Sequence, residues 1–124
     1  MILRNQLYSV SKYIPIDDGG VTAHIVLCAG HTIYKAHFPG QPITPGACLI
    51  QMARELMEDY SGLHLQLSGV KNAKFLNVIS PLETPELLFH MKPRGTGSLS
   101  IQVVVMWESE TFAKMTLDFT DNEH

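Results

Sequence analysis

The sequence is poor in cysteine and in basic residues, and it contains no long apolar run. Its two cysteines, Cys28 and Cys48, form no CxxC pair, a pattern typical of buried packing thiols in a reducing compartment. Nine Lys and Arg against twelve Asp and Glu leave a formal net charge of -3, which disfavours a nucleic-acid-binding protein. No segment approaches the ~20 apolar residues of a membrane span, and residues 1–10 lack a signal-peptide core. We therefore expect a cytoplasmic protein with no membrane association.

Histidine is present but not in metal-binding patterns. The six histidines show neither HxxxH nor HExxH spacing, so we expect no metal site, and nothing in the sequence indicates a cofactor.

The length and periodicity of the chain predict one folded domain over residues 1–124. Residues 47–60, at 100° per residue, gather one apolar arc and therefore predict a helix, which Gly62 ends; the arc comprises Leu49, Ile50, Ala53, Leu56, Met57 and Tyr60. Alternating apolar residues predict strands over 7–14, 21–29, 70–78, 87–92, 99–107 and 112–119. The first two strands are joined by a tight turn at residues 17–20, whose two glycines supply positive φ. This order predicts an α+β fold in which an antiparallel sheet covers the helix.

The loop before the predicted helix holds the residues best suited to chemistry. His37 lies among Pro39, Pro42 and Pro45, which would hold an imidazole at a fixed position, and imidazole accepts a proton near neutral pH. A lone histidine is more often a hydrogen-bonded structural residue, and that alternative stays open here.

Pro45 and Gly46 stand directly before the helix. The first N–H groups of a helix have no internal partner and lie at the positive end of its dipole, so the Gly46 N–H, with that of Ala47, could polarise a thioester carbonyl. The plainer alternative is that Pro-Gly only marks a helix start. His37, nine residues upstream, favours the functional interpretation.

The segment from His37 to Gly46, HFPGQPITPG, resembles the H-F-P-G-x-P-x-x-P-G signature of the bacterial 3-hydroxyacyl-(acyl-carrier-protein) dehydratases, including the hydroxymyristoyl type. A weaker similarity extends to residues 70–75 and Pro81. The resemblance implies a hotdog fold, in which a curved antiparallel sheet wraps a long central helix, and a homodimer or an assembly of dimers. It also implies loss of water from a 3-hydroxyacyl thioester, carried on acyl-carrier protein or coenzyme A, to give a 2-enoyl thioester in fatty-acid or related lipid synthesis.

The same resemblance implies roles for individual residues. His37 would remove the α-proton, Gly46 would hold the carbonyl, and a carboxylate on the partner subunit's helix would protonate the departing hydroxyl. Because carrier proteins are acidic, Lys35, Lys71, Lys74 and Arg94 are candidate docking contacts, although scattered basic residues are usually only solvated surface.

The chain departs from the family at the carboxylate. The position fourteen residues after His37 holds Gln51, whose amide cannot donate a proton at useful rates, while Glu55 stands one turn further on. A smaller departure is Ala36, where the family usually has glycine. Three interpretations are open: Glu55 replaces the acid, the chain binds acyl thioesters with little catalysis, or Gln51 serves a related reaction. For Glu55 itself, a solvated helix face is an equally weighted alternative.

Other branches of the same fold are less favoured. A hotdog thioesterase would use the same helix start with a water nucleophile, but the HFPG sequence points to the dehydratases. MaoC-like hydratases carry an Asp-x-Asn-Pro-x-His sequence, which is missing here.

Overall fold

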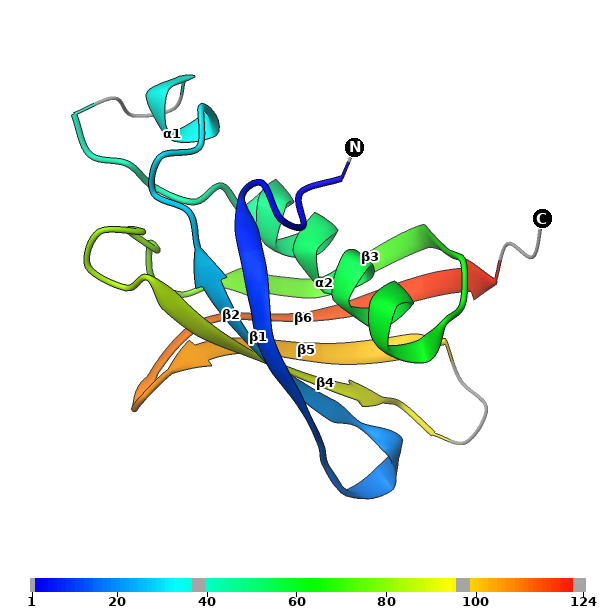
Figure 1. Ribbon diagram of the computed structural model, residues 1–124. Helices are drawn as coiled ribbons and strands as arrows, with labels where there is room; N and C mark the ends of the chain where they lie inside the picture. Colours follow the sequence, from blue (N-terminus) through cyan, green and yellow to red (C-terminus); the bar gives the residue numbers. More distant parts are fainter. Residues whose placement is uncertain (1, 37–39, 96–98, 122–124) are drawn as a thin grey trace.

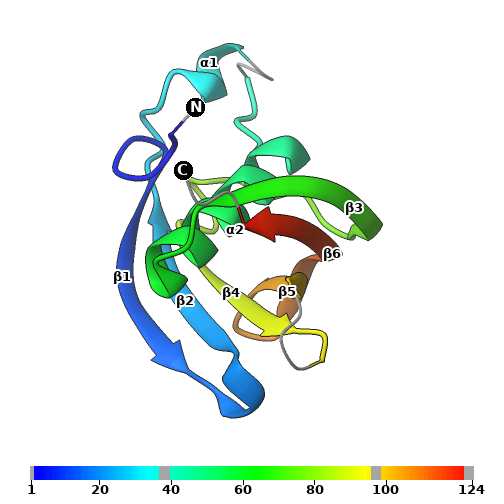
Figure 2. The ribbon, with the colours of Figure 1, turned by 90° about the vertical axis from the view of Figure 1, so that its right-hand side faces the viewer.

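The structure is a computed structural model that describes residues 2–36, 40–95 and 99–121. In this part of the chain, one antiparallel six-stranded sheet curves around a long helix, as Figures 1 and 2 show. The strands lie in the spatial order β1-β2-β4-β5-β6-β3 and comprise β1 (Tyr8–Pro15), β2 (Val21–Leu27), β3 (Leu65–Phe75), β4 (Glu86–Pro93), β5 (Ser100–Trp107) and β6 (Glu110–Asp121). The helices are η1 (Asp17–Gly19), α1 (Ile33–Ala36) and α2 (Gly46–Ser61). The predicted α+β layout is confirmed.

The long helix α2 begins and ends where its sequence predicts. Pro45 is its N-cap residue, and Gly62 ends it in the left-handed conformation at φ 76°, with its N–H donated to the Glu58 carbonyl at 2.9 Å. The helix buries one face against the sheet: Cys48, Leu49, Met52, Ala53, Glu55 and Leu56. Among the described residues, no helix combines the length and apolar character needed to cross a membrane.

The structure corrects several details of the predicted core. Tyr60 is 40% exposed and packs against Tyr13 with the two rings tilted by 44°, rather than entering the core. Cys28 is exposed, so only Cys48 is the buried thiol that was expected. In the turn before β2, Gly19 has positive φ, whereas Gly20 is at φ -84°. A side chain at Gly20 would come within 2.8 Å of the Met91 carbonyl oxygen, so close packing explains this second glycine.

The third strand starts five residues before its predicted start. Its first part, from Leu65, alternates between more buried and exposed residues, whereas residues 70–75 are all exposed. The prediction therefore missed a short period-two pattern that begins only three residues after Gly62. The short helix α1 was missed, since four residues are too few to show a helical period.

A buried carboxylate fastens the N-terminal segment to α2. Glu55 is 6% exposed, and its side chain accepts hydrogen bonds from the backbone N–H groups of Leu3 and Arg4, each at 2.8 Å. It also accepts one from the Tyr8 hydroxyl at 3.0 Å and one from Gln51 Nε2 at 2.7 Å. Four donors thus converge on one carboxylate, which fills the roughly four acceptor positions that a carboxylate offers. Burial, followed by the neighbouring Glu55 charge, raises the pKa of Tyr8.

A second, more exposed carboxylate extends the same attachment one turn along α2. Asp59 accepts a hydrogen bond from the Tyr13 hydroxyl at 2.6 Å and pairs with Arg4 at 2.5 Å. The Tyr13 hydrogen bond, with help from Arg4, lowers the pKa of Asp59. The N-terminal segment and β1 are therefore held to the helix by polar contacts, although the sequence places no such motif there.

The Glu55 attachment predicts a specific stability loss. Glu55→Gln keeps the side-chain size but turns one acceptor oxygen into an NH₂ donor that faces other donors. We expect a loss of about 1–3 kcal/mol in unfolding free energy, measured by urea denaturation. The control is Glu83→Gln at an exposed carboxylate, where we expect a change within about 0.5 kcal/mol. Equal effects of the two substitutions would show that Glu55 is not a structural anchor.

Candidate functional site

The loop that carries the HFPG sequence is anchored on both sides. His37, Phe38 and Pro39 lie outside the described residues, so the predicted base stays a prediction. The buried Tyr34 hydroxyl, before the HFPG sequence, shares a hydrogen bond at 2.9 Å with Thr44 Oγ1, which follows that sequence. The Thr44 N–H is in turn donated to the Ile79 carbonyl at 2.8 Å. The chain is therefore fixed immediately before it enters α2.

The start of α2 exposes backbone donors. The N–H groups of Cys48 and Leu49 are donated to the Pro45 carbonyl at 3.0 and 3.3 Å, which closes the first turn. The preceding N–H groups, of Gly46 and Ala47, belong to the set that a helix leaves without an internal partner. Pro45 provides no side-chain cap for them. They point out of the positive end of a 16-residue helix and are suited to hold a carbonyl oxygen or an oxyanion.

The ring of Phe75 lies directly against Gly46. A Cβ placed on Gly46 would come within 2.8 Å of Phe75 Cε1 and Cζ, so the ring occupies the space that any side chain would need. Phe75 ends β3 and is 51% exposed, an unusual position for a large apolar side chain. In the sequence, Phe75 stands only within the weaker family similarity of residues 70–75, which predicts no role for it. The structure adds it to the site as the residue that covers one side of the helix start.

Charged neighbours fix the orientation of the Gln51 amide. Its Nε2 donates to Glu55 Oε2 at 2.7 Å, and its Oε1 accepts from Arg54 Nε at 3.4 Å. Because a carboxylate only accepts and a guanidinium only donates, this amide has one preferred orientation. Arg54 is in turn held by Glu58 at 2.9 Å and by the Leu65 carbonyl at 3.1 Å.

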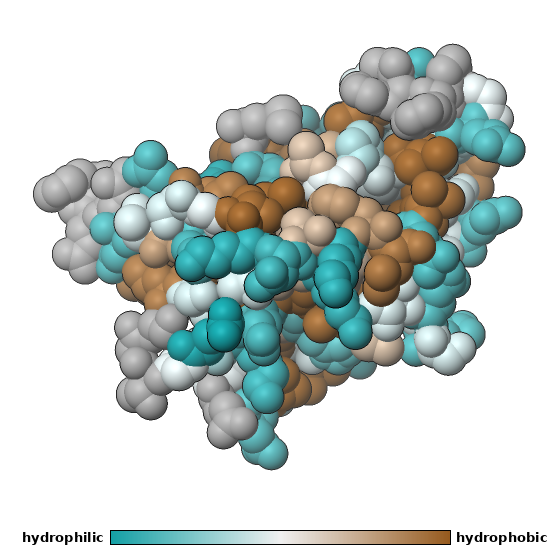
Figure 3. Space-filling view, turned by 180° about the vertical axis from the view of Figure 1, so that it is seen from behind, coloured by the Kyte–Doolittle hydropathy of each residue, from teal (hydrophilic) through white to brown (hydrophobic). Residues whose placement is uncertain are grey.

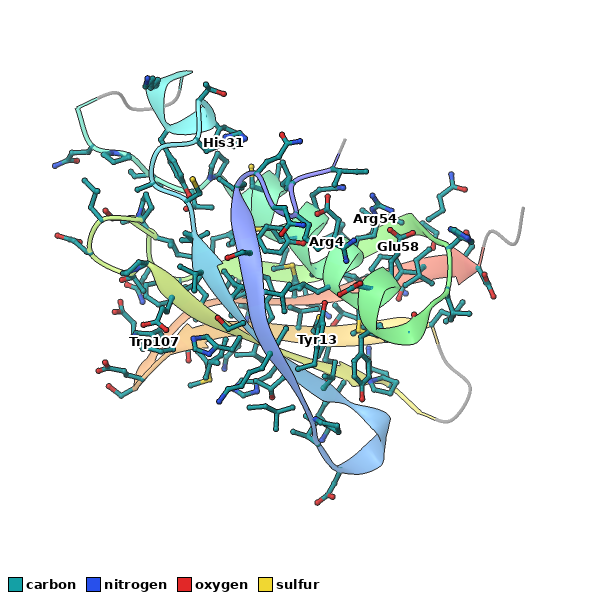
Figure 4. The ribbon with its side chains drawn as sticks, in the orientation of Figure 1. Arg4, Tyr13, His31, Arg54, Glu58 and Trp107 are labelled. Carbon is teal, nitrogen blue, oxygen red and sulfur yellow. The ribbon has the colours of Figure 1, made fainter. Side chains whose placement is uncertain are left out.

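Gln51 borders a groove of about 430 Å³ between α2 and the start of β3. Figure 4 shows Arg54 and Glu58 side by side on this part of the helix. The groove is lined by Ile50, Gln51, Arg54, Glu58, His64, Leu65, Gln66 and Leu67. Polar groups dominate this lining, so the groove alone is not the apolar channel expected for an acyl chain.

The position of Glu55 bears on the missing acid. The alternative that Glu55 belongs to a solvated helix face is wrong, because its side chain is buried. Its use as the acid stays a prediction. The four hydrogen bonds it makes among the described residues all have it as the acceptor, including the one from Gln51 at the groove, so each of its oxygens is already engaged. The geometry therefore disfavours proton donation from Glu55.

The candidate docking residues lie on different elements. Lys35 lies on α1, Lys71 and Lys74 lie on β3, and Arg94 directly follows β4. Of these, Lys74 is next to Phe75, whose ring packs against Gly46. Within the described ranges, no group of three or more His, Cys, Asp and Glu side chains is arranged to hold a metal ion.

Comparison with known proteins places this chain in a family. Residues 14–115 match the ApeI-like family, which is described as ApeI dehydratase. The chain is 28% identical over 105 residues to the 3-hydroxyacyl-[acyl-carrier-protein] dehydratase FabZ of Lactiplantibacillus plantarum, covering 77% of this chain and 70% of that protein. It is 38% identical over 64 residues to FabZ of Fusobacterium nucleatum, covering 48% of this chain and 44% of that protein.

Solved structures agree on the fold. The dehydratase heterocomplex ApeI:P from Xenorhabdus doucetiae superimposes with a TM-score of 0.75 at 14% identity, covering 89% of this chain and 95% of that one. An uncharacterized protein from Erwinia carotovora superimposes with a TM-score of 0.68 at 17% identity, covering 90% and 92%. The implied hotdog fold is therefore confirmed. Since the family match spans most of the sequence, this chain belongs to the ApeI-like dehydratase family.

Proposed function

We propose that this protein removes water from 3-hydroxyacyl thioesters to give 2-enoyl thioesters. The observation that carries the proposal is the start of α2, where the uncapped N–H groups of Gly46 and Ala47 follow a loop pinned by Thr44. This is the arrangement needed to hold the thioester carbonyl as negative charge develops on its oxygen. The FabZ relatives, named as 3-hydroxyacyl-[acyl-carrier-protein] dehydratases, support the same substrate class.

The proposed reaction has two steps. His37 takes the α-proton, and the electron pair of the broken C–H bond moves toward the carbonyl, whose oxygen is stabilised by the helix start. The pair then returns to form the α–β double bond as the bond to the β-hydroxyl breaks, and that hydroxyl leaves as water after gaining a proton. The reaction therefore needs three groups: a base, a hydrogen-bond donor to the carbonyl oxygen, and a source of the proton for the leaving hydroxyl.

The proton source of this chain departs from the family, because the chain has an amide at the position where the family has an acid. Gln51 is an amide, and Glu55 is engaged by four donors. We therefore propose that Gln51 positions the leaving hydroxyl and that His37 returns to this hydroxyl the proton it took from the α-carbon. A partner chain is the alternative source of an acid, and the similar structure ApeI:P is a dehydratase heterocomplex.

The buried Glu55 favours a second candidate, a subunit that binds acyl thioesters but turns them over slowly. In that case the chain would contribute a base and a carbonyl site to an assembly whose acid lies elsewhere. The two candidates differ in whether the purified chain has activity by itself.

Turnover of a 3-hydroxyacyl-carrier-protein substrate tests the proposal. We expect the parent protein to form the 2-enoyl thioester and His37→Ala to lower the rate by ~10²–10⁴-fold, because the base is lost. The double variant Gln51→Glu/Glu55→Gln exchanges the acid and the amide and should raise the rate, since it places a carboxyl group at the groove. Product is measured by mass spectrometry of the acyl group.

The matched control for that assay is His90→Ala, which removes a histidine bonded to Thr22 on the opposite face of the sheet and should leave the rate near that of the parent. Turnover only in the double variant would favour the acyl-binding subunit. No turnover in either the parent or the double variant, across acyl lengths, would contradict the dehydratase proposal.

We also propose that the chain forms a dimer through β3. This strand is an edge of the sheet, and residues 70–75 at its end are all exposed. Its end and the following segment expose an apolar strip, defined as Val70, Phe75, Leu76 and Val78, with exposed fractions of 41–68%. Figure 3 shows apolar surface on this side of the molecule. An open edge strand with exposed apolar side chains favours pairing with a second chain.

Light scattering coupled to gel filtration tests the dimer. We expect twice the 13.8 kDa mass of one chain, and we expect Val70→Asp to reduce that mass because it puts a charge into the strip. Ile14→Asp is the matched control, since Ile14 is an equally exposed apolar residue (42% against 41%) on the opposite edge strand, β1. A monomeric parent protein, or equal effects of the two substitutions, would argue against pairing through β3.

A further inference from the structure

The outer face of the sheet, which points away from α2, is apolar along its central strands. In β5 the residues from Val103 to Trp107 are apolar without a break, so its outward side chains are apolar as well as its inward ones. Such a run is typical of a strand that is covered on both faces. Figure 2 shows α2 inside the curve of the sheet, and within the described ranges no second layer covers the outer face.

Outward apolar side chains of three neighbouring strands lie side by side. Strand register places Leu88 of β4 opposite Met106 of β5, and His90, the next outward residue of β4, opposite Val104. Val26 lies on the other side of β4, on β2, next to Glu86. We call this surface the outer apolar band, and all of its members are half-buried: Val26, Leu88, Val104, Met106 and Trp107.

The outward imidazole of His24 holds one end of this band in place. The Trp107 ring stacks on His24 with the ring centroids 5.5 Å apart and the planes 25° apart. His24 Nε2 donates to Glu86 Oε1 at 2.8 Å, because a carboxylate only accepts. The indole and the Glu86 carboxylate are therefore already positioned on the outer face, which lowers the entropy cost of binding through it.

Charge is ordered along the strands on either side of the outer apolar band. The outward residues of β4 are, in order, Glu86, Leu88, His90 and Lys92, and Arg94 follows the strand directly. Three further carboxylates lie at the end of the sheet where β4 begins and β5 ends, and they line one depression of about 270 Å³: Glu83, Glu108 and Glu110. The outer face therefore has an acidic end and a basic end, with the apolar band between them.

A second copy of the chain is complementary to this face. A two-fold axis that runs across the strands, in the plane between two packed sheets, sets the acidic end of each copy against the basic end of the other. With this axis level with Phe89, Glu86 of each copy faces Lys92 of the other, and the two apolar bands meet. A partner with one sign of charge, such as a nucleic acid or an anionic membrane, would be repelled by the acidic end.

We propose that two copies of this chain associate through the outer faces of their sheets. This contact is separate from the proposed pairing through β3, because β3 is an edge strand and the apolar band lies on β2, β4 and β5. It therefore doubles the mass of whatever unit β3 forms, and it does not depend on the proposed reaction. Since the outer face is convex, two copies touch only along the band, and we expect a Kd on the order of 10⁻⁴ M, too weak to persist on a gel-filtration column.

Sedimentation velocity over a range of concentrations, at low salt, tests the outer-face contact. We expect the mass of the parent protein to double between about 10 µM and about 1 mM, and to double likewise in Val70→Asp, where pairing through β3 is impaired. Glu86→Lys leaves two lysines that face each other, and Lys92→Glu leaves two carboxylates. Each variant alone should associate about tenfold more weakly, whereas an equimolar mixture of the two should recover, because every facing pair then joins opposite charges.

The matched control is Lys35→Glu, the same charge change at an exposed lysine on α1, off the sheet, which should associate as the parent does. Parent-like association of both single variants, or no recovery in their mixture, overturns the proposal. So does a parent mass that stays constant with concentration, which is the result expected if a different protein covers the band. If Glu86→Lys fails to fold by circular dichroism, Met106→Lys replaces it, and parent-like association of that variant overturns the proposal equally.

Discussion

The hydrogen bonding of one buried carboxylate organises the side of the molecule on which the reaction is proposed. Glu55 lies within the helix face packed against the sheet, yet it is an acceptor for donors from the N-terminal segment, from β1 and from the helix itself. Burial of a charged group is costly unless its acceptor positions are filled. Loss of any one of these donors would therefore destabilise the buried carboxylate. The N-terminal segment, the first strand and the Gln51 amide consequently share one anchor.

The hydrogen bonds of Glu55 explain how the chain can keep the family's fold although Gln51 replaces the family's acid. If the usual acid position carried a second carboxylate, it would lie one helical turn from Glu55 and the two charges would repel. Gln51 avoids this repulsion and gives Glu55 a donor instead. The amide at position 51 and the carboxylate at position 55 are therefore coupled through their hydrogen bond. Sequence comparison alone would present them as two separate differences from the family.

Local sequence was sufficient to predict the parts of the fold that local physics determines. The helix from residue 47, its end at Gly62 and the helix start at Gly46 followed from periodicity, glycine and proline. Contacts between distant residues were not predictable in this way. Burial of Glu55 depends on Leu3, Arg4 and Tyr8, and the covering of Gly46 depends on Phe75. Each of these joins residues that are far apart in the chain.

The central claim is our proposal that this chain supplies the base and the carbonyl site of a dehydratase without a carboxylic acid at the family's usual position. Hydrogen exchange at the α-carbon tests it most directly, because exchange needs only the first two of these groups. A 3-hydroxyacyl thioester in D₂O should gain deuterium at its α-carbon faster than it loses water, as followed by mass spectrometry. Water loss without prior exchange, or no exchange above the rate without protein, would contradict the account.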